Sequence, residues 1–187
     1  MHMFNTAGSF PYYCTAHGAC CGMVGMVTVS NPMPTPTPPP SDFNGDGKPD
    51  FVLYKASTRQ TAIWYLNNAV FVNGAYGPTL PAGWSLVSVA DFNGDAHPDY
   101  TLFNPSTHQT AIWYLSGPTY MGSAYGPTLP SGWELVATGD FNGDGKPDYV
   151  LYNASTRQTA IWYMNNALFV RGAYGPSLPI GWSLVAP

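Results

Sequence analysis

The architecture of this chain follows from a nine-residue acidic loop, Asp42-Phe43-Asn44-Gly45-Asp46-Gly47-Lys48-Pro49-Asp50. It recurs as DFNGDAHPD at 91–99 and as DFNGDGKPD at 140–148, so each copy begins 49 residues after the one before. The chain has ten acidic residues, and every one except Glu134 lies in these three loops. A period of this length is typical of the blades of a β-propeller.

Each loop has the oxygen donors of a calcium site. Side-chain oxygens stand at positions 1, 3, 5 and 9, a backbone carbonyl is available at position 7, and glycines permit the tight wrap. Two carboxylates about 4 Å apart repel by roughly 4 kcal/mol at an effective dielectric of about 20, so three of them converging require a cation. We therefore expect about three Ca²⁺ sites, and the alternative is three polar turns that bind no metal. The predicted ligands are Asp42, Asn44, Asp46, Lys48 and Asp50 in the first loop; Asp91, Asn93, Asp95, His97 and Asp99 in the second; and Asp140, Asn142, Asp144, Lys146 and Asp148 in the third.

The composition favours a β protein. Hydrophobic residues make up 45% of the chain and charged residues only 9%, while 19 prolines and 20 glycines favour short strands joined by turns. No basic cluster is present, which argues against nucleic acid as a partner. No apolar run reaches transmembrane length and no signal peptide is visible. Because calcium loops suit a compartment rich in free calcium, we expect an extracellular or cell-surface protein whose chain is processed or a fragment.

Residues 1–30 carry a second kind of metal motif. Cys14, His17 and Met23 are spaced as the soft donors of a blue-copper site. Together with Val27-Thr28-Val29, they resemble the C-terminal signature of the cupredoxins, the plastocyanin-like proteins. That family takes a further histidine from a strand that would lie upstream of Met1, so we expect a remnant hairpin and do not expect this chain alone to bind copper. The alternative is a fragment of a blue-copper electron-transfer protein.

A linker and three repeats follow. The Pro/Thr-rich segment 31–41 predicts an extended, stiff spacer. The repeats are 42–90, 91–139 and 140–187. Within the first we expect strands at 51–54, 60–66 and 69–73, and the strand 84–90 leads into the next loop. The sequence thus predicts an all-β fold with three four-stranded propeller-type blades, an N-terminal β-hairpin and a Pro-rich linker.

The frame of the repeats leaves the first blade without an inner strand and leaves residues 182–187 as a spare one. Three blades are too few to close a propeller ring. We therefore expect the spare strand to complete the first blade of another copy, which gives a homo-oligomer or polymer assembled head to tail by strand exchange, as a ring or a filament.

Two tryptophans recur in every repeat. Trp64, Trp113 and Trp162 stand in strands with two apolar faces, which favours the core between blades. A second set stands beside glycine in loops, where the rings either complete the core or form a platform for a ligand such as a sugar. This set is Trp84, Trp133 and Trp182.

The three units resemble FG-GAP or VCBS repeats, which combine a DFNGDGKxD loop with strands. The resemblance implies a calcium-stabilised β-propeller whose ions lie on loop positions 1, 3, 5, 7 and 9. The second loop departs from the pattern with Ala96 and His97. Alanine at a positive φ angle is strained, so we expect the second calcium site to be the weakest.

No catalytic constellation is recognisable, because His97 and His108 stand alone and no carboxylate pair lies outside the loops. We expect a non-catalytic, calcium-stabilised extracellular scaffold or adhesion module. The alternative to the scaffold is a lectin-like propeller that binds a glycan or another cell-surface ligand through its aromatic residues.

Overall fold

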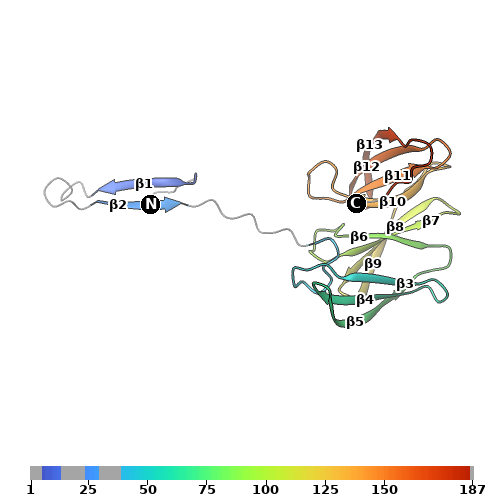
Figure 1. Ribbon diagram of the computed structural model, residues 1–187, viewed down its shortest axis with the longest axis horizontal. Helices are drawn as coiled ribbons and strands as arrows, with labels where there is room; N and C mark the ends of the chain where they lie inside the picture. Colours follow the sequence, from blue (N-terminus) through green and yellow to red (C-terminus); the bar gives the residue numbers. More distant parts are fainter. Residues whose placement is uncertain (1–5, 14–23, 30–38, 186–187) are drawn as a thin grey trace. The chain divides into compact units, whose positions relative to one another are not determined.

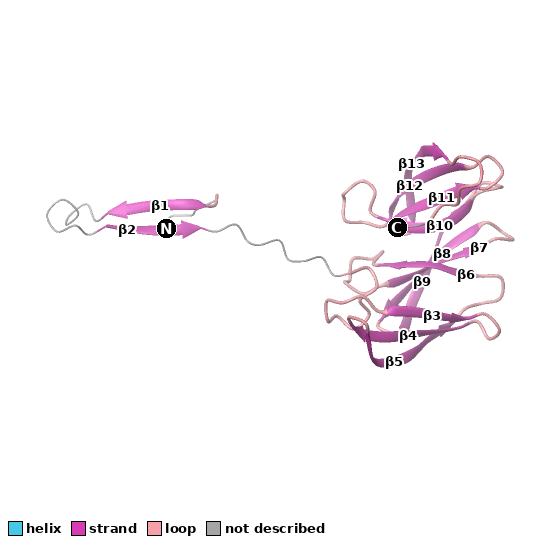
Figure 2. Cartoon of the chain, viewed as in Figure 1, coloured by secondary structure: helices cyan, strands magenta, loops and turns pink. Residues whose placement is uncertain are grey.

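The computed structural model describes residues 6–13, 24–29 and 39–185 (Figure 1). The chain divides into two units, residues 1–37 and 38–187. Every regular element in the described ranges is an antiparallel β-strand, which confirms the predicted all-β class (Figure 2).

The N-terminal unit contains a two-stranded sheet. β1 (Gly8–Tyr13) pairs with β2 (Val24–Val29), with Gly8 opposite Val29 and Tyr13 opposite Val24. The predicted hairpin is therefore present. The copper candidates Cys14, His17 and Met23 lie outside the described residues, as does most of the 31–41 linker.

The repeat unit contains three further sheets, one for each acidic loop. Sheet one has the order β3-β4-β5, sheet two β6-β7-β8-β9 and sheet three β10-β11-β12-β13. The strands of sheet one are β3 (Phe51–Lys55), β4 (Gln60–Asn67) and β5 (Val70–Thr79). Those of sheet two are β6 (Ser85–Ala90), β7 (Asp99–Asn104), β8 (Gln109–Ser116) and β9 (Thr119–Thr128). Those of sheet three are β10 (Glu134–Gly139), β11 (Asp148–Asn153), β12 (Gln158–Asn165) and β13 (Leu168–Ser177).

Sheet one has three strands in the described residues, one fewer than the other two, because no strand precedes its acidic loop as β6 and β10 precede theirs. At the other end, residues 182–185 lie outside any strand in the single chain, and 186–187 are not described. A strand is defined by its hydrogen-bonded neighbour, and the strand predicted here requires an edge supplied by a second copy, so the single chain does not test it.

The outermost strand of each sheet is longer than the sequence indicates. We expected residues 69–73, but β5 runs from Val70 to Thr79 and pairs along β4 as far as Gln60 opposite Thr79. The strand contains Pro78, which lacks a backbone N–H. An edge strand tolerates proline because one side of its backbone needs no partner.

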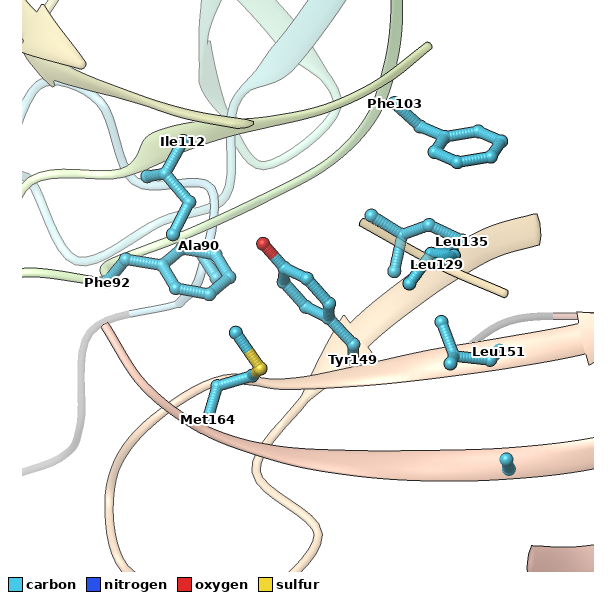
Figure 3. Packing of buried hydrophobic residues seen from close by; sticks show 10 residues of the cluster. Ala90, Phe92, Phe103, Ile112, Leu129, Leu135, Tyr149, Leu151 and Met164 are labelled. Carbon is cyan, nitrogen blue, oxygen red and sulfur yellow. The ribbon is translucent and has the colours of Figure 1, made fainter. Parts of the chain in front are cut away.

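Two apolar clusters fill the seams between consecutive sheets. The seam between sheets one and two buries Phe43, Ile63, Leu80, Tyr100, Leu102, Ala111 and Leu115. The seam between sheets two and three buries Ala90, Phe92, Phe103, Ile112, Leu129, Leu135, Tyr149, Leu151, Ala160 and Met164 (Figure 3). Both faces of sheet two are therefore covered, whereas sheets one and three each have one covered face.

This arrangement corrects one expectation for the strand tryptophans. Trp113 and Trp162 pack at the margins of the two clusters, as predicted. Trp64 remains 45% exposed because it lies on the uncovered face of sheet one.

Candidate metal loops and aromatic groove

The acidic loops precede β3, β7 and β11. β3 begins one residue after the last aspartate of its loop, whereas β7 and β11 begin at that aspartate. Gly45 and Gly47 have φ angles of 75° and 81°, which L side chains adopt only with strain, and these two residues turn the first loop. Ala96 has a φ of 66°, as the sequence predicts for the residue that replaces glycine in the second loop.

The first aspartate of each loop lies at the centre of the turn. Asp42 Oδ1 accepts hydrogen bonds from the N–H groups of Gly45 (2.8 Å) and Asp46 (3.1 Å), and its Oδ2 accepts one from Gly47 (2.8 Å). Asp91 and Asp140 make the same three bonds in their loops. These bonds hold the pKa of the exposed Asp140 below its usual range, and the Gly145 N–H is the main cause.

The donors at positions 3 and 5 continue the pattern. Asn44 Oδ1 accepts from the Asp46 N–H at 3.0 Å, and Asp46 Oδ1 accepts from the Lys48 N–H at 2.9 Å. The other two loops repeat both bonds. In the second loop the Asn93 amide also donates to Asp95 Oδ2 at 3.0 Å, which brings two predicted ligands together. All of these side chains are exposed to solvent.

The last aspartate of each loop is buried and connects the loop to a strand. Asp50 Oδ2 accepts from the Phe43 N–H at 2.9 Å, and its Oδ1 accepts from the Leu66 N–H of β4 at 2.9 Å. Asp99 and Asp148 do the same with the next two sheets. Sequence reasoning assigned these residues to metal binding and missed this structural role.

The buried aspartate of the second loop has a raised pKa. Burial is the main reason why the pKa of Asp99 rises to about 6, hydrogen bonds from the Leu115 and Phe92 N–H groups oppose the rise, and the charges of Asp95 and Asp91 add to it. The carboxylates of Asp91 and Asp95 thus disfavour the charged form of Asp99.

The donor set fits a hard cation in chemical type. Every predicted ligand is an oxygen, and a carboxylate oxygen that accepts one N–H bond retains a further lone pair. Among the described residues, however, no three His, Cys, Asp or Glu side chains are gathered as a metal site. Asparagine and carbonyl oxygens supply two of the five predicted ligands in each loop.

Two of the three loop tryptophans, Trp84 and Trp133, pack against the seams, and the third does not. Trp84 lies beside Tyr125 with ring centroids 6.2 Å apart, and Trp133 lies beside Tyr174 at 6.0 Å. Trp182 is 71% exposed. The tyrosines of these pairs also recur at the repeat period, as Tyr76, Tyr125 and Tyr174, and belong to the aromatic residues of the lectin-like alternative.

A groove of about 250 Å³ lies on sheet three beside Trp133. Its lining is mostly aromatic and aliphatic, and consists of Pro130, Trp133, Leu151, Ala160, Trp162, Phe169, Gly172, Ala173 and Tyr174. Trp162 lies against Gly172, where a Cβ atom would come within 2.9 Å of the indole ring. The glycine thus provides space for the ring.

Comparison with known protein families identifies the repeats. Residues 42–102 match the model of an FG-GAP-like repeat, and residues 132–164 match that of the FG-GAP repeat. No curated protein matches the chain. Across the described ranges, no helix has the length and apolar character needed to span a membrane. The two family matches coincide with the acidic loops and the strands that follow them, and the chain therefore contains FG-GAP repeats.

Proposed function

We propose that this chain is a non-catalytic, calcium-stabilised extracellular scaffold of the adhesion type, and that it self-assembles head to tail. One observation supports the calcium role. In all three loops the last aspartate is buried and accepts a hydrogen bond from a backbone N–H group of the adjacent strand. Ordering the loop therefore orders the sheet. FG-GAP repeats are typical of extracellular proteins, which agrees with this role.

Calcium would supply the positive charge that each group of carboxylates lacks. The residues that would hold it are those at loop positions 1, 3, 5 and 9, with the carbonyl of position 7. The protein contributes a turn already closed by the first aspartate and a last aspartate already fixed by two backbone N–H groups. A ligand that binds only the folded loop stabilises the fold by mass action.

The test is native mass spectrometry and thermal unfolding in calcium and in chelator. We expect up to three bound ions and a higher melting temperature in calcium. The matched variant replaces Asp46, Asp95 and Asp144 by alanine, because these exposed carboxylates hold no strand. It should fold in chelator and no longer respond to calcium. A melting temperature that chelator leaves unchanged in the parent protein would contradict the proposal.

The self-assembly proposal rests on the edge of sheet one. In sheet two the inner strand β6 pairs with β7 through Ser85 opposite Phe103 and Leu86 opposite Leu102. The repeat period transfers this register to Ser183 opposite Tyr54 and Leu184 opposite Leu53. We propose that the segment 182–187 of one copy pairs in this way with β3 of a second copy. The contact joins different surfaces, so it yields a ring or a filament.

Light scattering in calcium tests this contact. Deleting residues 182–187, or the single change Leu184→Pro, should reduce the assembly to monomers because the added strand is lost. Ile180→Ser is the control, since this side chain is 83% exposed and precedes the segment. A parent protein that is a monomer at all concentrations would contradict self-assembly.

Carbohydrate binding is a second candidate, and the aromatic groove on sheet three favours it. Aromatic rings with accessible faces can receive the apolar face of a sugar. Screening on a glycan array tests this function. Tyr174→Ala should remove any binding, whereas Tyr76→Ala should not, because the two tyrosines are 80% and 82% exposed but only Tyr174 lines the groove. An array without hits would exclude the glycans it displays.

A further inference from the structure

The two seams inside the chain are built from the same residue positions. In each seam a tyrosine from one sheet, the anchor residue, inserts into the preceding sheet. Tyr100 inserts into sheet one and Tyr149 into sheet two, and both are fully buried. A Cβ atom on Gly77 would lie only 3.0 Å from the Tyr100 hydroxyl, and one on Gly126 only 2.9 Å from that of Tyr149. Glycine is therefore needed where the anchor enters.

The surface that receives each anchor also repeats, and we call it the acceptor face. On sheet one it consists of Phe43, Thr61, Ile63, Gly77 and Leu80, and on sheet two of Phe92, Thr110, Ile112, Gly126 and Leu129. Phe43 meets Tyr100 edge to face at 6.2 Å, and Phe92 meets Tyr149 at 6.1 Å. Ile63 and Ile112 have no exposed surface.

Sheet three carries the same acceptor face, and no anchor from the described repeat residues, 39–185, covers it. It consists of Phe141, Thr159, Ile161, Gly175 and Leu178. Phe141 is 45% exposed, against 3% for Phe43 and 4% for Phe92. The face nevertheless has the internal geometry of the covered ones, since Thr159 Oγ1 donates to the Pro176 carbonyl at 2.7 Å, as Thr61 does to Pro78 at 2.7 Å.

Sheet one carries an anchor without an acceptor face. Phe51 stands at the position of Tyr100 and Tyr149, and it is 62% exposed whereas those two are fully buried. Trp64 on the same face is also exposed. Phenylalanine brings no hydroxyl group, so burying this anchor would leave no polar atom without a partner.

A polar contact points to the same pairing. Across the seam between sheets two and three, the Tyr114 hydroxyl donates to Asn166 Oδ1 at 2.6 Å. The repeat period assigns Tyr163 of sheet three and Asn68 of sheet one to these positions. Asn68 and Asn166 have nearly the same backbone conformation, with φ angles of 56° and 55°. The middle repeat has Gly117 at this position. The asparagine is thus present in sheet one, which has an uncovered face, and absent from sheet two.

We propose that Phe51 of one copy docks on the acceptor face of sheet three of a second copy and thereby forms a third seam of the same kind as the two within the chain. This inference rests on the proposed head-to-tail assembly and identifies the surfaces that make it. The Tyr163 hydroxyl donates to Asn68 of the other copy. Because the anchor and the acceptor face are different surfaces, each copy binds one neighbour on either side.

Sedimentation velocity in calcium tests the proposal with variants of each surface. Phe51→Ser removes the anchor, and Ile161→Lys places a charge on the acceptor face. Each variant should associate about tenfold to a hundredfold more weakly than the parent, because a buried apolar side chain contributes that much. Met121→Ser is the control, since Met121 is 66% exposed but belongs to sheet two, both faces of which are covered. If Ile161→Lys fails to fold, Phe141→Ser tests the same face.

Mixing the variants gives the decisive result. Phe51→Ser retains its acceptor face and Ile161→Lys retains its anchor, so an equimolar mixture should form a dimer with one copy of each and nothing larger. If the parent assembles and both variants assemble equally well, the docking surfaces are wrong while head-to-tail assembly through residues 182–187 stands. If the parent is a monomer at every concentration, the proposed self-assembly fails as well.

Discussion

The carboxylate of Asp99 holds the backbone of Leu115, because Oδ1 accepts a hydrogen bond of 3.0 Å from the Leu115 N–H. The same carboxylate accepts a bond from the Phe92 N–H at 3.0 Å through Oδ2. One side chain thus joins the loop before β7 to the strand β8. Its burial indicates that the last aspartate of each motif is structural even without an ion.

Asp99→Ala should therefore destabilise the protein in the absence of calcium. Two buried N–H groups lose their acceptor, at a cost of about 2 to 5 kcal/mol in the free energy of unfolding. Urea denaturation in chelator measures this change. Asp95→Ala is the matched control: the side chain is exposed, and its removal should change stability by less than about 0.5 kcal/mol. Equal stabilities of the two variants would contradict the structural role.

Ala96→Gly should improve the second loop. Alanine at a φ of 66° is strained by about 1 kcal/mol. Glycine removes this strain but loses more chain entropy on folding, so the net gain in stability is smaller than the strain. We expect a small gain in stability and tighter calcium binding at this loop, measured by denaturation and by calorimetric titration. Gly145→Ala in the third loop, where φ is 78°, should have the opposite effect. Unchanged binding in both variants would show that this position does not set affinity.

Gly126→Ala should disturb the seam between sheets two and three. An added Cβ would collide with Thr110 Oγ1 and lie within 2.9 Å of the Tyr149 hydroxyl. Overpacking of this kind costs about 1 to 3 kcal/mol. Gly122→Ala is the control on the same strand, since a Cβ there meets nothing within 4 Å. Thermal unfolding compares the two, and a Gly126 variant as stable as the control would contradict the described seam.

Tyr149→Phe should maintain or raise stability at neutral pH. The hydroxyl is buried without a hydrogen bond of ordinary geometry. Thr110 lies close enough to lower the pKa of Tyr149 slightly, against the larger rise caused by burial. Burial raises the pKa of Tyr149 to about 12. Because the folded pKa lies above the unfolded value near 10, the protonated ring stabilises the fold fully below about pH 10, and this contribution declines as the pH rises towards 12.

The variant should consequently lose less stability than the parent between about pH 10 and pH 12. Urea denaturation across this range measures the difference. Tyr76→Phe is the control because Tyr76 is 82% exposed. A parallel loss of stability in the parent and in Tyr149→Phe would show that the hydroxyl does not titrate within the seam.

The sequence alone determined the local features of this protein. Tightly turned acidic loops, the repeat period, short strands and the three-stranded first sheet all follow from residues that are close together in the chain, where glycine conformation and side-chain alternation decide the structure. Residues 182–185 form no strand in the single chain, and the outer strands were predicted too short, because strand pairing depends on neighbours that a single segment does not reveal.

Which faces of the sheets are covered depends on how the sheets stack. The segment Gln-Thr-Ala-Ile-Trp-Tyr is identical in all three repeats, yet its tryptophan is exposed in sheet one and packed in sheets two and three, and its isoleucine is fully buried in the first two sheets and partly exposed in the third. The burial of a side chain depends on whether another sheet packs on its face. Identical segments therefore differ in burial only because they have different neighbours. The pairing of strands within each sheet also brought the last aspartate of each loop to a backbone N–H group of the following strand, which the spacing of oxygen donors could not indicate.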